Sequence, residues 1–319
     1  LGFGVVTMLT LMLPHYALLT RRAALWAALA GSVLLLLLPF AGPEIHGTHR
    51  WFRIYGVSMQ PSELIKPVLV LVVAASLVHA GEELRRWSGL TRPLLLAGLL
   101  TGLVLAGKDL GTPVLLVTTT LAVAFVAGAR LRHLSALALA GVPLFLLFAR
   151  MEAYRWERLT NFTQALGVSG ASFEAVTGQL RQSLIAIGSG GIAGKGFGSS
   201  SQKAFFLPER DTDFVFAIIA EELGMIGAFA VLALFLVLGW RGVCIARDAR
   251  DRLGMLIASG ATCLLCTQAL CHAGVVTGLL PTKGLPLPFL STGGSSLIAS
   301  FALVGLLLNV SLRRRARGT

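Results

Sequence analysis

Residues 207–214, with the sequence Leu-Pro-Glu-Arg-Asp-Thr-Asp-Phe, gather acids and bases in a chain that has few of either. Only 13% of the residues are charged, and the mean hydropathy is +0.79. Asp213 is the last charged residue of this segment and directly precedes an apolar run, and Lys195, Lys203 and Arg210 come before it. Acids and bases kept together in so apolar a chain indicate a polar, anionic ligand. The pattern predicts a reaction site at a membrane surface.

Asp213 is the residue of this segment best suited to proton transfer. We expect it in the first turn of a helix, where the positive end of the helix dipole favours an ionised carboxylate. An ionised carboxylate can take a proton from a hydroxyl and so act as a general base. From the residues alone, a simple helix N-cap is the competing interpretation.

Four cations in the segments outside the predicted spans could hold a departing diphosphate, because positive charge stabilises a leaving group of this kind. They are Arg50, Lys195, Lys203 and Lys283. Two of them, placed together, would be enough. For each one taken alone, a solvated charge or a contact to lipid headgroups is the favoured interpretation.

Charged residues near span ends are the next candidates, because ionisable groups at membrane depth are usually paired or functional. Glu63 and Lys66 are three residues apart and therefore share one helix face. The pair is interpreted either as a structural ion pair that holds this helix end or as part of the reaction site. Asp109 lies in a turn between two apolar runs, where it could cap a helix or bind a ligand.

The elements that must position these residues are apolar runs of the length that a helix needs to cross a bilayer, about 20 residues. They lack the period-2 alternation of barrel strands. The sequence predicts an all-α polytopic membrane protein with a single domain over residues 1–319. The nine predicted spans are 1–20, 23–42, 62–80, 93–107, 112–128, 133–149, 213–239, 254–276 and 293–312.

The predicted span 213–239 is unusual, because 27 residues is long for one span, and Glu221 and Glu222 would lie about 12 Å deeper than Asp213 in a continuous helix. We therefore expect the helix to break near Gly224. In the preceding 150–212 loop, residues 179–187 predict a short amphipathic helix, and 188–198 predict a glycine-rich turn.

The orientation follows from arginine and lysine, which are enriched in cytoplasmic loops. One set of alternate loops holds fifteen of them: Arg21, Arg22, Arg85, Arg86, Arg92, Arg130, Arg132, Arg241, Arg247, Arg250, Arg252, Arg313, Arg314, Arg315 and Arg317. Apart from the long 150–212 loop, the other set holds four: Arg50, Arg53, Lys108 and Lys283. The C-terminus is thus predicted in the cytoplasm, and the 150–212 loop and Leu1 outside.

The same distribution argues against nucleic acid as a partner, although the net charge is +12. Topology and anionic lipid headgroups account for the arginines. Cys263 and Cys266 have no His or Asp partners in the sequence around them, so their spacing does not predict a metal site. We expect small apolar packing as the role of the cysteines.

The chain resembles the SEDS family (shape, elongation, division and sporulation) of membrane glycosyltransferases that polymerise peptidoglycan. The matching motifs occur in family order along the whole chain. They are Gly47-Thr-His-Arg50-Trp51, Gln60-Pro-Ser-Glu63-Leu-Ile-Lys66, Asp109-Leu-Gly-Thr112, Gln182-Ser-Leu-Ile-Ala-Ile-Gly-Ser-Gly-Gly191, Gly194-Lys-Gly196, Leu207-Pro-Glu-Arg-Asp-Thr-Asp-Phe214, Glu221-Glu-Leu-Gly224 and Gly278-Leu-Leu-Pro-Thr-Lys-Gly-Leu-Pro-Leu-Pro-Phe-Leu-Ser-Thr-Gly-Gly-Ser-Ser296.

The resemblance implies a polymerase that joins lipid II, the undecaprenyl-diphosphate-linked disaccharide pentapeptide, in the bacterial cytoplasmic membrane. It implies Asp213 as the catalytic base and substrate-binding roles for Arg50, Glu63, Lys66, Asp109, Gln182, Lys195, Lys203, Lys283 and Ser295. The implied partners are a class B penicillin-binding protein and other division-complex proteins. No protein metal site is implied, although a divalent cation such as Mg²⁺ or Mn²⁺ could assist.

Segments 199–203 and 281–284 resemble the division branch (FtsW) more than the elongation branch (RodA). The family has ten spans and a cytoplasmic start, so we expect one further apolar stretch upstream of Leu1. Asp211 stands where the family usually has His, and His272 where Asn is common. A second acid at position 211 could alter the titration of Asp213 or compete for its role.

Three other functions fit the spans. A lipid II flippase would use the same intramembrane charges, but neither an inverted repeat nor a pair of matched broken helices is visible. An elongation-type polymerase would differ only in its cellular role. A scaffold without catalysis should tolerate the loss of Asp213.

Overall fold

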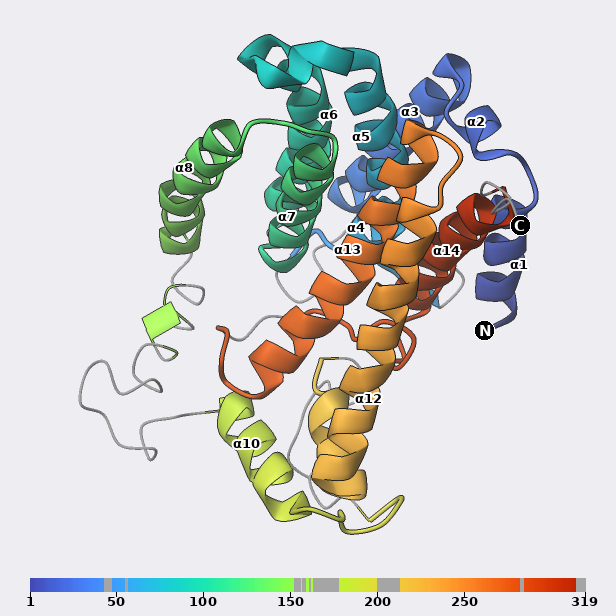
Figure 1. Ribbon diagram of the computed structural model, residues 1–319. Helices are drawn as coiled ribbons and strands as arrows, with labels where there is room; N and C mark the ends of the chain where they lie inside the picture. Colours follow the sequence, from blue (N-terminus) through green and yellow to red (C-terminus); the bar gives the residue numbers. More distant parts are fainter. Residues whose placement is uncertain are drawn as a thin grey trace. The chain divides into compact units, whose positions relative to one another are not determined.

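The computed structural model describes residues 1–42, 48–54, 57–151, 156, 159–160, 162, 178–199, 213–281 and 284–313. In these residues the chain is almost entirely α-helical (Figure 1), which confirms the predicted all-α class. One short antiparallel hairpin joins β1 (Phe52–Ile54) to β2 (Val57–Met59), with Phe52 opposite Met59. The predicted 150–212 loop falls largely outside the described residues.

Seven helical segments within the described residues are long and apolar enough to cross a membrane. They are α3 (Arg22–Leu37) with η1 (Leu38–Ala41), α4 (Pro61–Leu64) with α5 (Lys66–Ala80) and η2 (Gly81–Arg85), α6 (Trp87–Ala106), α8 (Leu131–Arg150), α12 (Val215–Arg247), α13 (Arg252–Val276) and α14 (Gly294–Leu312). Two apolar helices are shorter, α1 (Gly2–Met12) and α7 (Gly111–Val126). The chain is a multi-pass membrane protein, and these helices lie where spans were predicted. The count of nine spans stays a prediction.

The first predicted span, 1–20, is interrupted. The helix α1 ends at Met12, and a separate turn, α2 (Tyr16–Leu19), follows Pro14. Asn309 on α14 satisfies the backbone groups freed by this interruption, since its side-chain amide donates to the carbonyls of Leu11 (2.5 Å) and Pro14 (2.7 Å). Its carbonyl oxygen accepts from the Tyr16 N–H at 3.2 Å.

The fourth predicted span, 93–107, begins earlier than the sequence indicated. The helix α6 starts at Trp87, so Pro93 lies inside it. A proline inside a helix is unfavourable, because it lacks the N–H that a helix interior uses. The first turns form nonetheless, and Gly89 lies close to the backbone of Glu83, where a Cβ would be 2.3 Å from the carbonyl oxygen.

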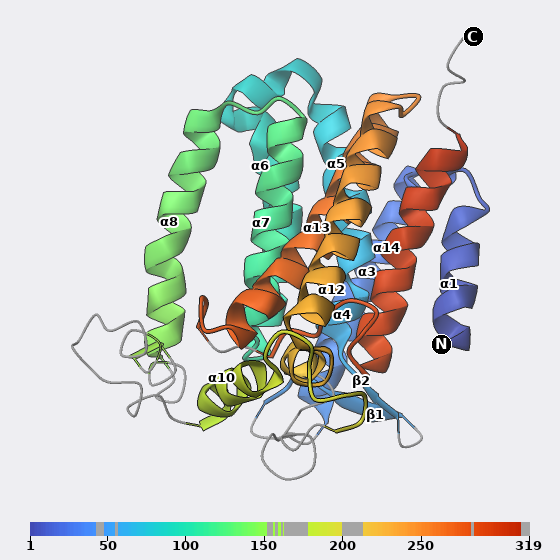
Figure 2. The ribbon, with the colours of Figure 1, turned by 60° about the horizontal axis from the view of Figure 1, so that its bottom comes forward.

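The chain divides into two compact units. The first comprises residues 1–138, 238–266 and 293–319, and the second comprises 139–237 and 267–292. In the first unit, α5 is largely buried and packs against α3, α6, α7 and α14 (Figure 2). The helix α1 packs along α14, where a Cβ on Gly305 would lie 2.6 Å from the Met8 carbonyl oxygen. This glycine therefore permits close helix contact.

The second unit has its own apolar core. Its buried side chains include Ala186 from α10 (Gly178–Gly190), Phe214 and Phe216 at the start of α12, Ala273 from α13, and Leu287. The helix α10 confirms the helix predicted at 179–187. The Ser183 hydroxyl donates to the Val276 carbonyl oxygen at 2.7 Å and ties α10 to the end of α13.

Candidate active site

The helix α12 is broken at Gly224, as the sequence predicted. Gly224 has φ 68° and ψ −166°, which is not helical. A residue with a side chain rarely adopts this backbone conformation. The break divides α12 into a short segment that follows Asp213 and a longer segment from Met225 to Arg247 that is apolar for most of its length.

The glycine-rich turn at 188–198 fills this break. The N–H groups of Lys195 and Gly196 donate to the carbonyls of Glu221 and Glu222, both at 3.0 Å. Beyond the break, the Met225 N–H donates to the Gly191 carbonyl at 2.9 Å, and the Ile226 N–H to the Ile192 carbonyl at 3.3 Å. Backbone groups that the break would leave unpaired in the membrane are therefore satisfied by this turn.

Two glycines make this contact possible. A Cβ on Gly194, which has φ +81°, would lie 2.2 Å from the Glu222 carbonyl oxygen. A Cβ on Gly224 would lie 2.4 Å from both the Gly194 nitrogen and the Ile192 carbonyl oxygen. The two backbones approach so closely that a side chain at either position would push them apart.

Gly224→Ala is expected to lower the free energy of unfolding by about 2–4 kcal/mol, because it adds backbone strain to a steric clash. Thermal unfolding of the purified protein in detergent would measure this loss. Gly188→Ala is the matched control, since a Cβ on Gly188 would meet no atom within 4 Å. Equal stability of the two variants would contradict the tight contact.

A buried acid lies directly before the break. Glu221 is fully buried, and its Oε1 accepts from the Lys195 Nζ at 2.7 Å and from the Ser189 hydroxyl at 3.4 Å. The Lys195 side chain remains 35% exposed, so the cation can reach a ligand while it neutralises Glu221. Glu222 is also buried, and its Oε1 has no hydrogen-bond partner among the described residues.

Asp213 lies at the other end of the short segment. The carbonyl of Phe214 accepts the first bonds of α12, from Ala217 (2.9 Å) and Ile218 (3.3 Å), so Phe214 is the N-cap. Asp213 therefore precedes the cap and does not lie in the first helical turn, which is a correction, because α12 begins at Val215 and not at the predicted position 213. The field at the helix N-terminus still extends over a group so close to it.

The carboxylate of Asp213 faces the backbone of Gly284. A Cβ on Gly284 would lie 2.5 Å from the Asp213 Oδ2. A side chain at position 284 would clash with the carboxylate, so glycine at this position leaves room for it. Gly284 belongs to the 278–296 motif, but the sequence alone predicted no role for it. Its position directly after Lys283, a predicted site residue, was the feature that could have indicated one.

The segment that carries Gly284 is held against the end of α13. The Gln268 amide donates to the Pro286 carbonyl at 2.7 Å. The buried His272 ring nitrogen Nδ1 lies 2.6 Å from the Leu285 carbonyl oxygen. These bonds fix the backbone that Asp213 faces. His272 is thus a positioning residue that sequence reasoning noted only as a departure from the family.

In the first unit, Asp109 is the centre of a buried polar cluster. Its Oδ1 accepts from the N–H groups of Gly111 (2.9 Å) and Thr112 (3.3 Å) and so caps α7. Its Oδ2 accepts from the hydroxyls of Thr112 (2.9 Å) and Ser62 (3.2 Å) and from the Gln60 amide (3.4 Å). The helix cap that the sequence offered as one of two roles is confirmed.

Asp109→Ala is expected to destabilise the protein by at least about 2 kcal/mol, because it removes a helix cap and leaves buried donors unpaired. Asp109→Asn should cost less, since one oxygen remains to accept. Thermal unfolding measures both variants. A loss of activity with no loss of stability in Asp109→Ala would instead favour a direct role in ligand binding.

The other predicted residues of the first unit lie around this cluster. The Ser295 hydroxyl accepts from the Gln60 N–H at 2.9 Å, so Ser295 holds the loop before α4. Arg50 donates from Nη2 to the Lys108 carbonyl, next to Asp109. Lys66 and Glu63 form the predicted ion pair, with Nζ and Oε1 2.5 Å apart and both side chains almost fully buried.

For three predicted site residues, the described part of the structure shows no contact that supports a role in the site. Lys203 and Lys283 lie outside the described residues. Gln182 is half-buried on α10, one residue before Ser183. Among the described residues, no group of three or more His, Cys, Asp and Glu side chains could hold a metal ion.

These features define a class of protein: a polytopic helical membrane protein with a broken helix, a carboxylate at its start and buried charges at helix ends. The chain belongs to the FtsW, RodA and SpoVE family of cell cycle proteins, whose model matches residues 1–316. The predicted SEDS membership is therefore confirmed.

Two curated relatives illustrate the similarity. A probable peptidoglycan glycosyltransferase FtsW from Geobacter sp. (strain M18) is 38% identical over 89% of this chain and 76% of its own length. The stage V sporulation protein E of Bacillus subtilis (strain 168) is 37% identical over 97% of this chain and 84% of its own.

Solved structures agree with the fold. The rod shape determining protein RodA of Thermus thermophilus has a TM-score of 0.71 and 30% identity over 99% of this chain and 86% of its own. A chain described under the structural coordination of polymerization and crosslinking by a peptidoglycan synthase complex has a TM-score of 0.78 and 29% identity, covering 98% and 87%.

Proposed function

We propose that the chain joins lipid II units into glycan strands for septal wall synthesis and releases undecaprenyl diphosphate. Curated relatives that are 38% and 42% identical over most of the chain are named probable peptidoglycan glycosyltransferases, and this chain is an enzyme of that class. The observation that carries the proposal is the placement of Asp213, whose carboxylate faces the Gly284 backbone directly before α12.

Asp213 is the general base of the proposed reaction. It takes the proton of the acceptor sugar hydroxyl, whose oxygen attacks the anomeric carbon of the donor. A new glycosidic bond forms, and the bond between the anomeric carbon and the diphosphate oxygen breaks. The configuration at that carbon inverts, because the displacement has a single step. The lipid diphosphate leaves with the bonding electron pair.

Cations near the diphosphate stabilise the charge that develops on it. Lys195 suits this role, because its side chain is partly exposed while Glu221 orients the ammonium group. Arg50, Lys203 and Lys283 complete the proposed set. A divalent cation that binds the diphosphate of the substrate would supply the same stabilisation.

The polymerase is proposed to work with a class B penicillin-binding protein in the cytoplasmic membrane. The similarity to a chain from a peptidoglycan synthase complex supports such a partner. The division role rests on the names of the FtsW relatives. A RodA structure of similar fold keeps the elongation role as the alternative.

The test of this function is polymerisation of purified lipid II by the purified protein together with its partner. Glycan strands resolved by electrophoresis are the expected product, and an Asp213→Asn variant is the negative control. A protein that moves lipid II across vesicle membranes but yields no strands, even with the partner, would favour the flippase.

The site must open outside the cell, because lipid II is polymerised there in this proposal. In a variant without the four native cysteines, Phe197→Cys should react with an impermeant maleimide added to intact cells. Phe197 is 89% exposed in the glycine-rich turn. Arg250→Cys, in the opposite set of loops, should react only after the membrane is opened. The reverse pattern would invert the topology and remove the site from its substrate.

A further inference from the structure

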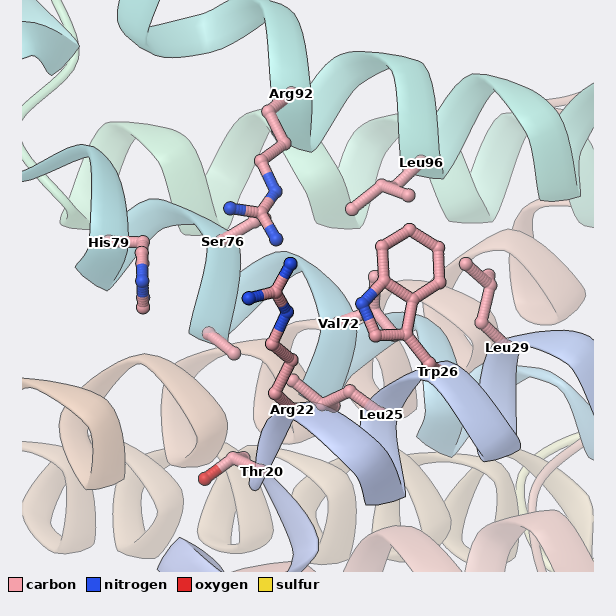
Figure 3. A pocket seen from close by; sticks show the side chains of 11 residues that line it. Thr20, Arg22, Leu25, Trp26, Leu29, Val72, Ser76, His79, Arg92 and Leu96 are labelled. Atoms are coloured by element: carbon pink, nitrogen blue, oxygen red, sulfur yellow. The ribbon is translucent and has the colours of Figure 1, made fainter.

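A pocket within the first unit lies at the arginine-rich end of α3, α5 and α6, and none of the predicted site residues lines it (Figure 3). It offers about 220 Å³, far more than the ~10–15 Å³ that one water molecule requires. Three basic side chains line it, from the first residue of α3, the last turn of α5 and the early turns of α6. They are Arg22, His79 and Arg92.

The two arginines converge. Figure 3 shows the guanidinium groups of Arg22 and Arg92 pointing toward one another across the pocket. Among the residues that the structure describes, no acidic side chain lines the pocket, and neither guanidinium forms an ion pair. Two like charges that face each other without an acid repel, so an anion between them would be stabilised by both.

Apart from Thr20 and Ser76, the rest of the pocket wall is apolar. Leu25, Trp26 and Leu96 line it, and Trp26 is 50% exposed. Figure 3 shows the Trp26 indole beside the Arg22 guanidinium. A tryptophan next to arginines at a helix end is typical of the membrane–water interface. The wall therefore suits a ligand with an anionic head and an acyl chain.

We propose that this pocket binds the phosphodiester headgroup of an anionic phospholipid in the leaflet that the arginine distribution assigns to the cytoplasm. The guanidinium groups donate to the phosphate oxygens as paired forks. The indole and the leucines contact the upper acyl chain. Basic pockets between spanning helices on this side favour such headgroups. The proposal depends on no step of the glycosyl transfer.

The test is native mass spectrometry of the protein in a non-ionic detergent, titrated with phosphatidylglycerol and separately with phosphatidylcholine. We expect preferential binding of phosphatidylglycerol, weakened roughly 10- to 30-fold in the variant R22Q/R92Q. The matched control is R21Q/R86Q, which removes two charges from the same helix ends but leaves the pocket lining intact. It should change the affinity by less than about threefold. Equal losses in both variants would overturn the proposal in favour of general surface charge.

A second measurement needs no arginine variant. The chain has five tryptophans, so the difference between wild type and Trp26→Phe isolates the Trp26 fluorescence. Brominated phosphatidylglycerol should quench this signal more than brominated phosphatidylcholine at the same mole fraction, and equal quenching would reject the site. Sodium phosphate and glycerol 3-phosphate at millimolar concentration should displace little lipid. If they bind the pocket more strongly than the lipid does, its ligand is a soluble phosphate and the lipid assignment is wrong.

Discussion

Asp213→Ala is expected to lower the rate of glycan polymerisation by about 10²–10⁴-fold, which is the usual effect of losing a general base. Asp213 precedes the N-cap of α12, and its carboxylate lies against the Gly284 backbone. Binding of lipid II should change little, because the proton moves only during the reaction. The measurement is the initial rate of strand formation with the partner present, alongside a lipid II binding assay.

Asp213→Asn is the closer variant, since it keeps the size of the side chain and removes its basicity. It should lose as much activity as Asp213→Ala. Asp211→Asn should lose less, and an equal loss would give Asp211 a share of the role. Retention of full activity in Asp213→Ala would remove the base and favour a scaffold or a flippase.

The buried pair of Glu63 and Lys66 should produce the largest effect on stability. Both side chains are almost fully buried, since the relative exposure is 2% for Glu63 and 1% for Lys66. The Lys66 Nζ and the Glu63 Oε1 are 2.5 Å apart. Lys66→Met alone leaves a buried carboxylate without its cation. Breaking such a pair costs about 3–5 kcal/mol. Thermal or denaturant unfolding in detergent should show this loss for either single substitution.

The double variant Glu63→Leu/Lys66→Met should be more stable than either single variant, because an apolar pair needs no charge compensation. The coupling energy from the four proteins is the decisive quantity. Additive effects would mean that the two residues do not support one another. Arg21→Gln is a control for charge removal at an exposed position and should leave stability nearly unchanged.

The sequence by itself determined the class of the protein and most of its helices. Apolar runs near 20 residues predict spanning helices because the bilayer leaves backbone groups no other partner. The three-residue spacing of Glu63 and Lys66 predicted their ion pair, because those positions share a helix face. The break at Gly224 followed from a run too long for one span and from two acids that it would carry into the membrane.

Only the tertiary structure decided which distant residues pair with the interrupted helices and with the carboxylate of Asp213. The end of α1 depends on Asn309, almost 300 residues away in the sequence, so no local pattern could reveal it. The turn at 188–198 was predicted as a turn, but its four hydrogen bonds to the break join segments separated by the 200–212 stretch. Gly284 faces Asp213 across about 70 residues of chain. Local spacing determines helices because their hydrogen bonds are local, whereas these contacts arise only when distant segments pack together.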